Sequence, residues 1–385
     1  MSKFLIPVYK KVGPVFVKGK GSFLWDKDGN RYLDLFPGWG VSILGHCHPE
    51  IVRVINEQSK DLIHLPNNLF HPWQDALAEK LVEKAFKSKV FFGNSGTEAV
   101  EAAIKFSRLY GRKNNRYEII TMKDSFHGRT FGSLSATGQS KYKKAFKPVL
   151  PGFVEAFFND FGDFRKKVTK KTVGVMLELI QGEGGVNIAT PEYVVKLRQF
   201  CTKNDLLFIA DEVQTGMGRT SKLFCYQNYD IEPDIMLLSK GLGAGFPVSA
   251  ILVKNDIADV MKPGMHASTF GGNPLASRVG LEVLDLIKRE RVLFNVKRMG
   301  NYLIKELLRL KEKFSLIKDV RSMGLMAGVE LFSEAQPLFE EALREKLIIN
   351  CTHQNVLRIM PALNVKKDEL DLGLDILKSI FEKLC

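Results

Sequence analysis

The sequence contains few cysteines and no long apolar run. Its five cysteines are scattered and form no CxxC pair, so neither a disulfide framework nor a zinc site is expected; they are Cys47, Cys201, Cys225, Cys351 and Cys385. No uncharged run reaches the ~18 residues that a membrane span needs. The apolar stretch in MSKFLIPVYKK is too short for a signal peptide. We therefore expect a cytoplasmic protein with no membrane partner.

Several common catalytic motifs are also missing. The chain has no GxxxxGK[ST] phosphate loop, no HExxH metal pair and no GxSxG nucleophile elbow, and no metal site is expected. Its formal net charge of +13 comes from basic residues spread along the chain, without the alternation of basic and aromatic residues that single-strand binders show. This charge favours small anionic ligands over nucleic acid. A non-enzymatic basic binding protein stays open as an alternative.

What the sequence does contain is a series of short, continuous apolar runs that end in small or polar residues. Such runs are typical of strands buried on both faces of a sheet, and helical stretches lie between several of them. This alternation predicts an α/β fold with a mostly parallel central sheet flanked by helices. The runs are KVFFGNSG, EIITMKDSF, VGVMLELIQGEGG, LLFIADEVQ, DIMLLSKG and VSAILVK.

The two chain ends have a different pattern. FVKGKGSFLWDKDGNRYLDL near the start predicts strands joined by a turn, and the chain after Asn273 alternates long helices with strand-like VRSMGLMAGVEL and LRIMPAL. A length of 385 residues suits one large and one smaller domain. We predict an N-terminal segment (1–50) that joins the small domain, a large domain (51–272) and a small α+β C-terminal domain (273–385).

Ligands of open sheets bind at the carboxyl ends of the strands, so the polar residues there are the candidate site. GNSGTEAV sets Ser95, Gly96 and Thr97 between a strand and a helix, where free N–H groups and the helix dipole attract an anion such as a phosphate. An ordinary strand-to-helix turn is the alternative.

Two further strand ends carry opposite charges. Asp211 follows LLFIA, where a carboxylate needs a cationic partner; a protonated pyridine nitrogen is one, and a helix N-cap is the alternative role. Lys240 follows IMLLS, where burial lowers an amine's pKa and makes it a nucleophile able to form an imine; a surface lysine is its alternative. Parallel neighbouring strands direct both groups into one crevice, which suits pyridoxal chemistry.

Arginines and an aromatic ring complete the candidate site. Phe126 can stack on a flat ring and Arg129 can grip a carboxylate, although core packing and a surface ion pair are the plain alternatives. Arg358 lies among apolar residues in VLRIMPAL and therefore needs a carboxylate, either from a substrate or from Glu183 in QGEGG.

Taken together, these motifs resemble the class III aminotransferases, fold-type-I enzymes that use pyridoxal 5'-phosphate. The likeness covers nearly the whole chain, through LGHCHPEIV, NSGTEAVEAAIKFSR, SFHGRTFGSLSATGQSKY, QGEGG, ADEVQTGMGRT, PDIMLLSKGLGAGFPVSA and HASTFGGNPLAS. SFHGRT followed by SATGQ is most similar to the acetylornithine branch. FPGWG differs from the alanine- and glycine-rich stretch usual in the family and brings Trp39 near the substrate pocket.

The resemblance implies a role for each candidate residue. Lys240 would bind the cofactor covalently and then shuttle protons, and Asp211 would pair with its pyridine nitrogen. Gln214 would meet the ring hydroxyl, and Arg358, masked by Glu183, would bind a substrate carboxylate. The remaining positions are Val213 and Phe126 on either side of the ring; Gly96 and Thr97, with Thr269 of a second subunit, at the phosphate; and Ser268 and Arg129 at the substrate.

The implied reaction moves the terminal amino group of N-acetylornithine to 2-oxoglutarate, in a homodimer with shared sites. The alternative is a related reaction on ornithine, 4-aminobutyrate or succinyl-diaminopimelate.

Overall fold

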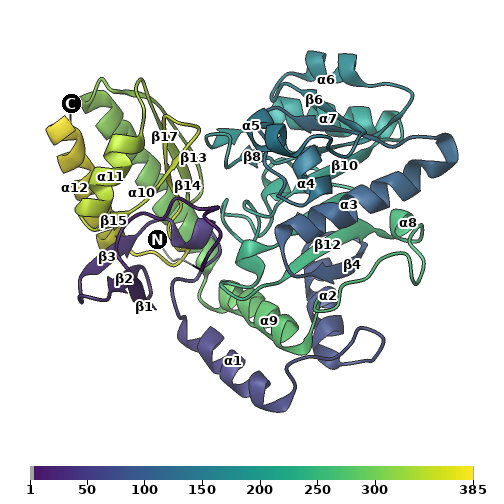
Figure 1. Ribbon diagram of the computed structural model, residues 1–385, viewed down its shortest axis with the longest axis horizontal. Coiled ribbons are helices and arrows are strands. Elements are labelled where there is room, and N and C mark those ends of the chain that lie inside the picture. The colour runs from purple at the N-terminus through teal and green to yellow at the C-terminus, as the bar shows by residue number, and fades with distance from the viewer. Residues whose placement is uncertain (1–3, 385) are drawn as a thin grey trace.

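The structure is a computed structural model that describes residues 4–384, so Cys385 lies outside the described residues. Two bodies lie side by side (Figure 1). The larger contains a seven-stranded sheet from the middle of the chain, and the smaller is built from both chain ends, shown in purple and in green to yellow. No helix within residues 4–384 has the length and apolar character needed to cross a bilayer.

The central sheet confirms the predicted α/β fold. All six apolar runs form strands of it, and one edge strand, β6, was not predicted. Its order is β4-β12-β11-β10-β7-β5-β6. β12 runs antiparallel to both neighbours, while the other pairs are parallel. The strands are β4 (Ser88–Gly93), β5 (Glu118–Met122), β6 (Phe153–Ala156), β7 (Thr172–Leu177), β10 (Leu207–Asp211), β11 (Ile235–Leu238) and β12 (Ser249–Lys254).

The segment VGVMLELIQGEGG, which its apolar pattern predicts to be one strand, is interrupted in the structure. β7 ends at Leu177, and the next short strand, β8 (Ile180–Gln181), pairs with β9 (Asn187–Ile188) in a separate ribbon. The apolar residues continue past the end of the strand because the ribbon is itself buried, so hydrophobicity alone gives no boundary. Glu178 lies in this break, directly after the end of β7.

Both faces of the sheet are covered, which explains why its strands are apolar throughout. Alternate residues such as Ile209 and Ile235 pack with α3 (Gly96–Gly111) on one face, while Phe208 and Met236 belong to the core on the other. That second core contains side chains of α2 (Pro72–Lys84), α7 (Pro191–Lys203) and α9 (Pro274–Arg289). Shorter helices at the margins are α4 (Phe131–Ala136), α5 (Ser140–Lys143), α6 (Phe161–Lys167) and α8 (Asn255–Ala258).

The smaller body joins the two chain ends, as predicted. In its first sheet β3 pairs in parallel with β15, more than 300 residues later in the chain. That sheet contains β1 (Phe16–Lys20), β2 (Phe23–Asp26), β3 (Arg31–Asp34) and β15 (Leu347–Ile348). The second contains β13 (Ile317–Met323), β14 (Met326–Leu331), β16 (Asn350–Thr352) and β17 (Val356–Ile359). The helices are α10 (Val292–Lys313), α11 (Gln336–Arg344) and α12 (Lys367–Leu384).

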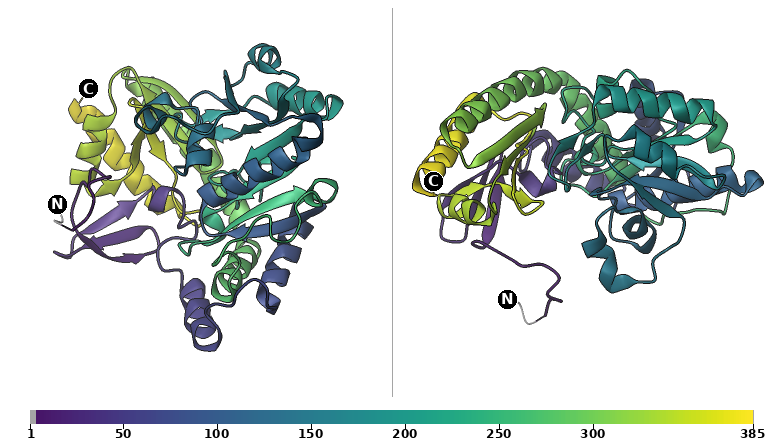
Figure 2. Two further views of the ribbon diagram at one scale, coloured as in Figure 1. Left: turned by 45° about the vertical axis from the view of Figure 1, so that its right-hand side comes forward. Right: turned by 90° about the horizontal axis from the view of Figure 1, so that it is seen from above.

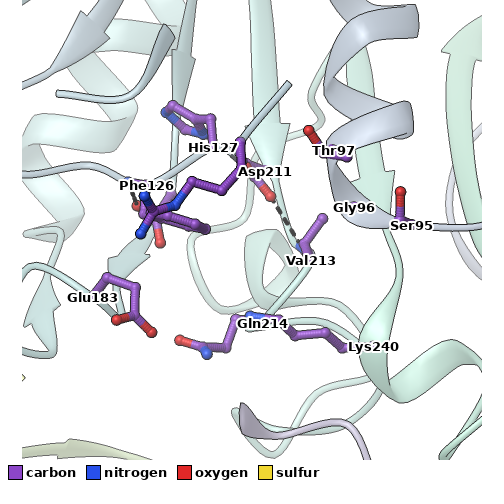
Figure 3. Close-up of a pocket in the computed structure, with 13 residues that line it drawn as sticks. Ser95, Gly96, Thr97, Phe126, His127, Glu183, Asp211, Val213, Gln214 and Lys240 are labelled. Carbon is purple, nitrogen blue, oxygen red and sulfur yellow. Dashed lines mark hydrogen bonds and ion pairs between the residues drawn. The ribbon is translucent and has the colours of Figure 1, made fainter. Parts of the chain in front are cut away.

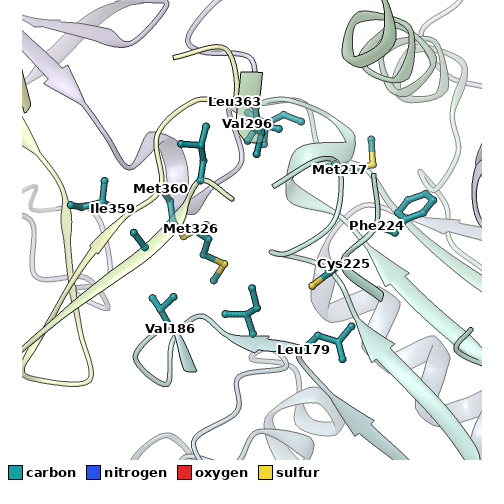
Figure 4. Close-up of a cluster of buried hydrophobic side chains, with 14 of the residues drawn as sticks. Leu179, Val186, Met217, Phe224, Cys225, Val296, Met326, Ile359, Met360 and Leu363 are labelled. Carbon is teal, nitrogen blue, oxygen red and sulfur yellow. The ribbon is translucent and has the colours of Figure 1, made fainter. Parts of the chain in front are cut away.

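One hydrophobic core continues across the junction of the two bodies. Leu179 and Phe224 of the larger body belong to the same buried cluster as Met326 and Met360 of the smaller (Figure 4). Figure 2 shows the two bodies next to each other in two further views. Because burying this shared surface stabilises both parts, they pack as one unit.

The exact domain boundaries stay a prediction. α9, which we assigned to the C-terminal domain, lies beside α1 (Pro49–Asp61) and α2 at the base of the larger body (Figure 1).

Candidate active site

Six strands of the central sheet end at the same edge, because only β12 runs in the opposite direction. The segments that follow five of them, all but β6, form a pocket of about 280 Å³. The side chains that line it point into one hollow (Figure 3). The lining residues are Ser95, Gly96 and Thr97 after β4; Phe126, His127, Gly128 and Arg129 after β5; Glu178 and Glu183 after β7; Asp211, Val213 and Gln214 at β10; and Lys240 after β11.

Lys240 occupies the turn that directly follows β11. Its backbone lies in the left-handed region (φ 39°), which is unfavourable for a residue with a side chain and is tolerated mostly at functional positions. Burial lowers the pKa of its amine, and the charge of Glu183 offsets part of that effect. Within residues 4–384 no hydrogen bond or ion pair holds this amine. The site therefore contains an amine that gives up its proton more readily than an exposed lysine does.

Asp211 ends β10 and forms a buried pair with His127. One carboxylate oxygen lies 2.7 Å from the His127 Nδ1, and the other accepts the Val213 N–H at 3.1 Å. Burial acts to lower the pKa of His127, but the bond to Asp211 outweighs it and leaves the pKa raised. His127 was not assigned a role from the sequence. Its partner lies 84 residues along the chain, and only the parallel strands bring them together.

Glu178 is a second lining residue that was not identified from the sequence. Its carboxylate accepts the Phe126 N–H at 2.8 Å and the Gly182 N–H at 3.3 Å. Burial raises its pKa to about 7. The available signal was a lone glutamate inside the apolar run VMLELI. The pocket wall thus holds the carboxyl groups of Asp211 and Glu178, both of which act on His127, in addition to that of Glu183.

Glu212, the residue that follows β10, does not line the pocket and gives a stability prediction. It accepts the N–H groups of Cys225 and Tyr226 at 2.5 and 2.7 Å, and burial raises its pKa from 4.5 to about 7. The folded chain therefore retains a proton here that the unfolded chain loses near pH 4.5. The free energy of unfolding should fall by about 3 kcal/mol from this group as the pH rises from 4.5 to 7.

The test compares the natural protein with Glu212→Gln, both as holoenzymes. Because glutamine does not titrate, the variant should gain about 3 kcal/mol relative to the natural protein between pH 4.5 and 7.5, seen as diverging urea midpoints. Parallel midpoints across that range would show that Glu212 is ionised throughout.

The first turn of α3 forms an anion cradle. Ser95 is its N-cap, and the Ser95 carbonyl accepts the Ala99 N–H as the first bond of the helix. The N–H groups of Gly96 and Thr97 come before this bond and therefore have no acceptor within the helix. Glu98 fixes the preceding loop by accepting the Asn94 N–H at 2.9 Å and the Ser95 hydroxyl at 2.8 Å. The Ser95 hydroxyl therefore donates to Glu98 and does not cap the N–H groups of the helix. Two N–H groups remain directed at the pocket.

The pocket fits a flat, phosphorylated ring. Phe126 and Val213 both line it, and a Cβ built on Gly96 would lie 2.8 Å from the Val213 Cγ1, so only glycine allows the helix to approach this closely. The N–H cradle suits a phosphate, Asp211 suits a cationic ring nitrogen, and Lys240 suits an aldehyde. The donor set thus matches pyridoxal phosphate, and within residues 4–384 no cluster of His, Cys, Asp and Glu suits a metal ion.

Arg358 lies behind the pocket on β17 and is fully buried. It donates to Glu183 at 2.7 Å, to Asn350 at 2.8 Å and to the Gln214 amide oxygen at 3.3 Å. Gln214 in turn donates to the Trp39 carbonyl at 3.2 Å. Of these residues Glu183 and Gln214 line the pocket, so they separate the guanidinium from it. Burial acts to raise the pKa of Glu183, but the charge and the hydrogen bond of Arg358 outweigh it, so the pKa of Glu183 is lowered.

Two expected residues lie outside the pocket. Ser268 and Thr269 are in the loop before α9; the Ser268 hydroxyl accepts from Asn94 at 3.3 Å, and Thr269 is exposed. Within one chain the structure therefore brings nine of the predicted site residues to the pocket wall and Arg358 behind it, but neither residue of this loop.

Comparison with known proteins identifies the family. The sequence pattern of the family described as aminotransferase class-III matches residues 8–381. The chain belongs to the class III aminotransferases. It is 47% identical to the acetylornithine aminotransferase of Caldanaerobacter subterraneus over 99% of this chain and 98% of that one. It is 44% identical to that of Aquifex aeolicus over 98% and 99%.

The fold agrees with solved structures of the same kind. The ornithine aminotransferase of Toxoplasma gondii, crystallised with partial occupancy of pyridoxal phosphate at its active site, superimposes with a TM-score of 0.94 at 30% identity, covering 98% of this chain and 92% of that one. The chain is thus a fold-type-I, pyridoxal-phosphate-dependent aminotransferase, as predicted. The alternative of a non-enzymatic binding protein is wrong.

Proposed function

We propose that this aminotransferase transfers the terminal amino group of N-acetylornithine to 2-oxoglutarate, giving N-acetylglutamate semialdehyde and glutamate, a step of arginine biosynthesis. The observation that carries the proposal is the pair of arginines at the pocket. Arg129 lines it and has no carboxylate partner among residues 4–384, whereas Arg358 is covered by Glu183. Similarity to acetylornithine aminotransferases over nearly the whole chain supports the same substrate.

In this proposal Lys240 and Asp211 are the catalytic residues and hold the cofactor at its reactive end and its ring nitrogen. Phe126 and Val213 enclose its ring, while the N–H groups of Gly96 and Thr97 bind its phosphate. Gln214 contacts the ring hydroxyl. Bound pyridoxal phosphate supplies an electron sink next to the carbon that bears the substrate's amino group.

Lys240 then moves the proton. Because burial lowers its pKa, the Lys240 amine is available as a base to remove the proton from the amine-bearing carbon of the substrate. The protonated amine then acts as the acid that returns this proton as the amino group is transferred. Asp211 faces the ring nitrogen, and the His127 Nδ1 lies 2.7 Å from its carboxylate and holds it in place. Both half-reactions use the same two residues, which suits a ping-pong sequence.

The two arginines, Arg129 and Arg358, allow the site to bind two kinds of substrate. Arg129, together with Ser268, binds the carboxylate of the acylated donor. When glutamate or 2-oxoglutarate enters, its second carboxylate takes the place of Glu183 on Arg358. One site thus accepts a substrate with one carboxylate and a substrate with two.

Replacing Arg358 with lysine tests this division. Lysine keeps the charge but loses the fork that bonds a carboxylate at two points, so the KM for 2-oxoglutarate should rise roughly 10- to 100-fold while the KM for N-acetylornithine changes less than twofold. Arg112→Lys, at an exposed site far from the pocket, is the matched control and should change neither. Equal increases in both KM values would contradict separate roles.

A substrate panel tests the function itself. Purified enzyme with 2-oxoglutarate should form glutamate from N-acetylornithine with a higher kcat/KM than from ornithine, 4-aminobutyrate or succinyl-diaminopimelate. Ornithine is the second candidate, because the chain superimposes closely on an ornithine aminotransferase. Glutamate formation from other amines but not from N-acetylornithine would overturn the proposal.

We also infer that the enzyme is a homodimer with shared active sites. Exposed apolar side chains gather on the loops around 62–71 and 262–273, where Phe70 is 95% and Phe270 59% exposed. Asn67 links the two loops by donating to the Ser268 and Gly271 carbonyls. An exposed apolar surface of this kind favours association, and Thr269 would reach the partner's phosphate site. A sedimentation mass of one 43.4 kDa chain would refute the dimer.

The proposed location is the cytoplasm, with small-molecule substrates and neither nucleic acid nor a membrane as partner. Cys47, Cys201, Cys225 and Cys351 are free thiols, which suits a reducing compartment. Cell fractionation tests this location; activity in the membrane fraction would contradict it.

A further inference from the structure

Arg129 at the pocket is held by aromatic rings. Its guanidinium carbon lies 3.9 Å from the centre of the Tyr142 ring and 5.5 Å from that of Phe126. The two rings meet edge to face, with centres 6.0 Å apart and planes at 85°. At 3.9 Å the cation is in contact with the Tyr142 ring, which is the stronger of the two attractions.

No polar group in the described part of the chain competes for this guanidinium. Within residues 4–384 Arg129 makes no hydrogen bond to a side chain or backbone oxygen and no ion pair. Arg358 is the opposite case, since Glu183, Asn350 and Gln214 all accept from it. The direction in which Arg129 points is therefore set by the rings, and without them its long side chain would sample many rotamers.

Tyr142 is itself held in place from both sides. It lies on α5, whose first turn is closed by the Tyr142 N–H donating to the Gln139 carbonyl at 3.1 Å. Gln139 donates to the Asp124 carbonyl after β5, and Lys143 pairs with Glu155 of β6 at 2.5 Å. The ring is thus fixed relative to the central sheet, and so to the pocket.

We propose that Tyr142 is a positioning residue that orients the Arg129 guanidinium toward the pocket for the carboxylate of the amine donor. The proposal rests on the proposed function, in which Arg129 binds that carboxylate. The N–H donors of a guanidinium lie in its plane, so a ring against its face leaves the fork of donors open. Prior ordering of the side chain lowers the entropic cost of binding.

The first test is equilibrium binding to the holoenzyme, which needs no turnover. N-acetylnorvaline carries the carboxylate and the acetamide of the donor but no terminal amine, and its carboxamide lacks the charge. Tyr142→Leu removes the ring and should weaken binding of the acid about fivefold, while Tyr142→Phe keeps the ring and should stay within twofold of the natural protein. Binding of the carboxamide should not change in either variant.

The second test is kinetic. In the half-reaction with N-acetylornithine alone, Tyr142→Leu should raise the half-saturating concentration about fivefold and leave the limiting rate within twofold. A residue with a merely structural role would change the limiting rate or act equally on the acid and the carboxamide. If Tyr142→Phe raised the half-saturating concentration as much as Tyr142→Leu, the hydroxyl and not the ring would be responsible, and the proposal would be overturned.

A double-mutant cycle separates this inference from the function beneath it. Arg129→Met alone should weaken binding of the acid, and Tyr142→Leu should add nothing in that background. If Arg129→Met has no effect, the assigned role of Arg129 fails. If Arg129→Met weakens binding but Tyr142→Leu does not, or if the two effects add, the role of Tyr142 fails while the function stands.

Discussion

Replacing Lys240 with alanine is expected to lower the transamination rate roughly 10⁴-fold, without unfolding the protein. The amine lies in the pocket at the end of β11, and burial lowers its pKa so that it can accept and return a proton. Alanine removes both the covalent attachment point and the proton carrier. The rate is measured as glutamate formed from N-acetylornithine and 2-oxoglutarate at saturating cofactor.

Three comparisons sharpen this prediction. Lys144→Ala removes an exposed lysine outside the pocket and should keep full activity. Lys240→Arg keeps a cation that cannot lose its proton, so it should be as inactive as the alanine variant. Lys240→Gly should be inactive yet more stable than Lys240→Ala in the cofactor-free state, because glycine accommodates a φ of 39° without strain. Turnover within tenfold of the natural enzyme in Lys240→Ala would refute the assignment.

The sequence predicts the sheet and much of the pocket for one physical reason. Strands buried on both faces are apolar along their whole length, so a charged residue at the point where such a run ends is conspicuous, and Asp211 and Lys240 were found in this way. The direction of β12 was not predictable by the same means, since an apolar run looks alike in either direction.

Residues whose roles depend on distant partners escaped prediction. Glu178 lies in an apolar run that continues past the end of β7, and His127 gains its meaning only from Asp211 on another strand. Tyr142 follows a lysine in a polar segment and looks like a surface residue until the fold brings it against Arg129. In each case the chemistry arises from a contact between strand ends or loops far apart in sequence, which no local pattern encodes.

The second large effect is expected at Asp211. Asp211→Asn should lower the rate roughly 10²–10³-fold, because asparagine keeps the size and the bond to the Val213 N–H but cannot balance a positive charge on the ring nitrogen. The pKa of His127 should fall in this variant, since the bond and charge of Asp211 are what hold it up against burial. The measurements are kcat in the full reaction and the titration of the His127 ring followed by NMR.

Loss of folding must be distinguished from loss of chemistry, and Asp234 offers a matched control. Like Asp211, Asp234 is a buried aspartate next to a central strand, and it pairs with Arg198 at 2.6 Å and with Lys254 at 3.1 Å. Unlike Asp211, it lies at the opposite end of the sheet, just before β11, and outside the pocket. Asp234→Asn should lower the unfolding temperature at least as much as Asp211→Asn, because it weakens two ion pairs, and yet retain turnover within about twofold. If both variants lost activity in proportion to stability, Asp211 would be a structural residue, and the electron sink would have to be sustained without a carboxylate at the ring nitrogen.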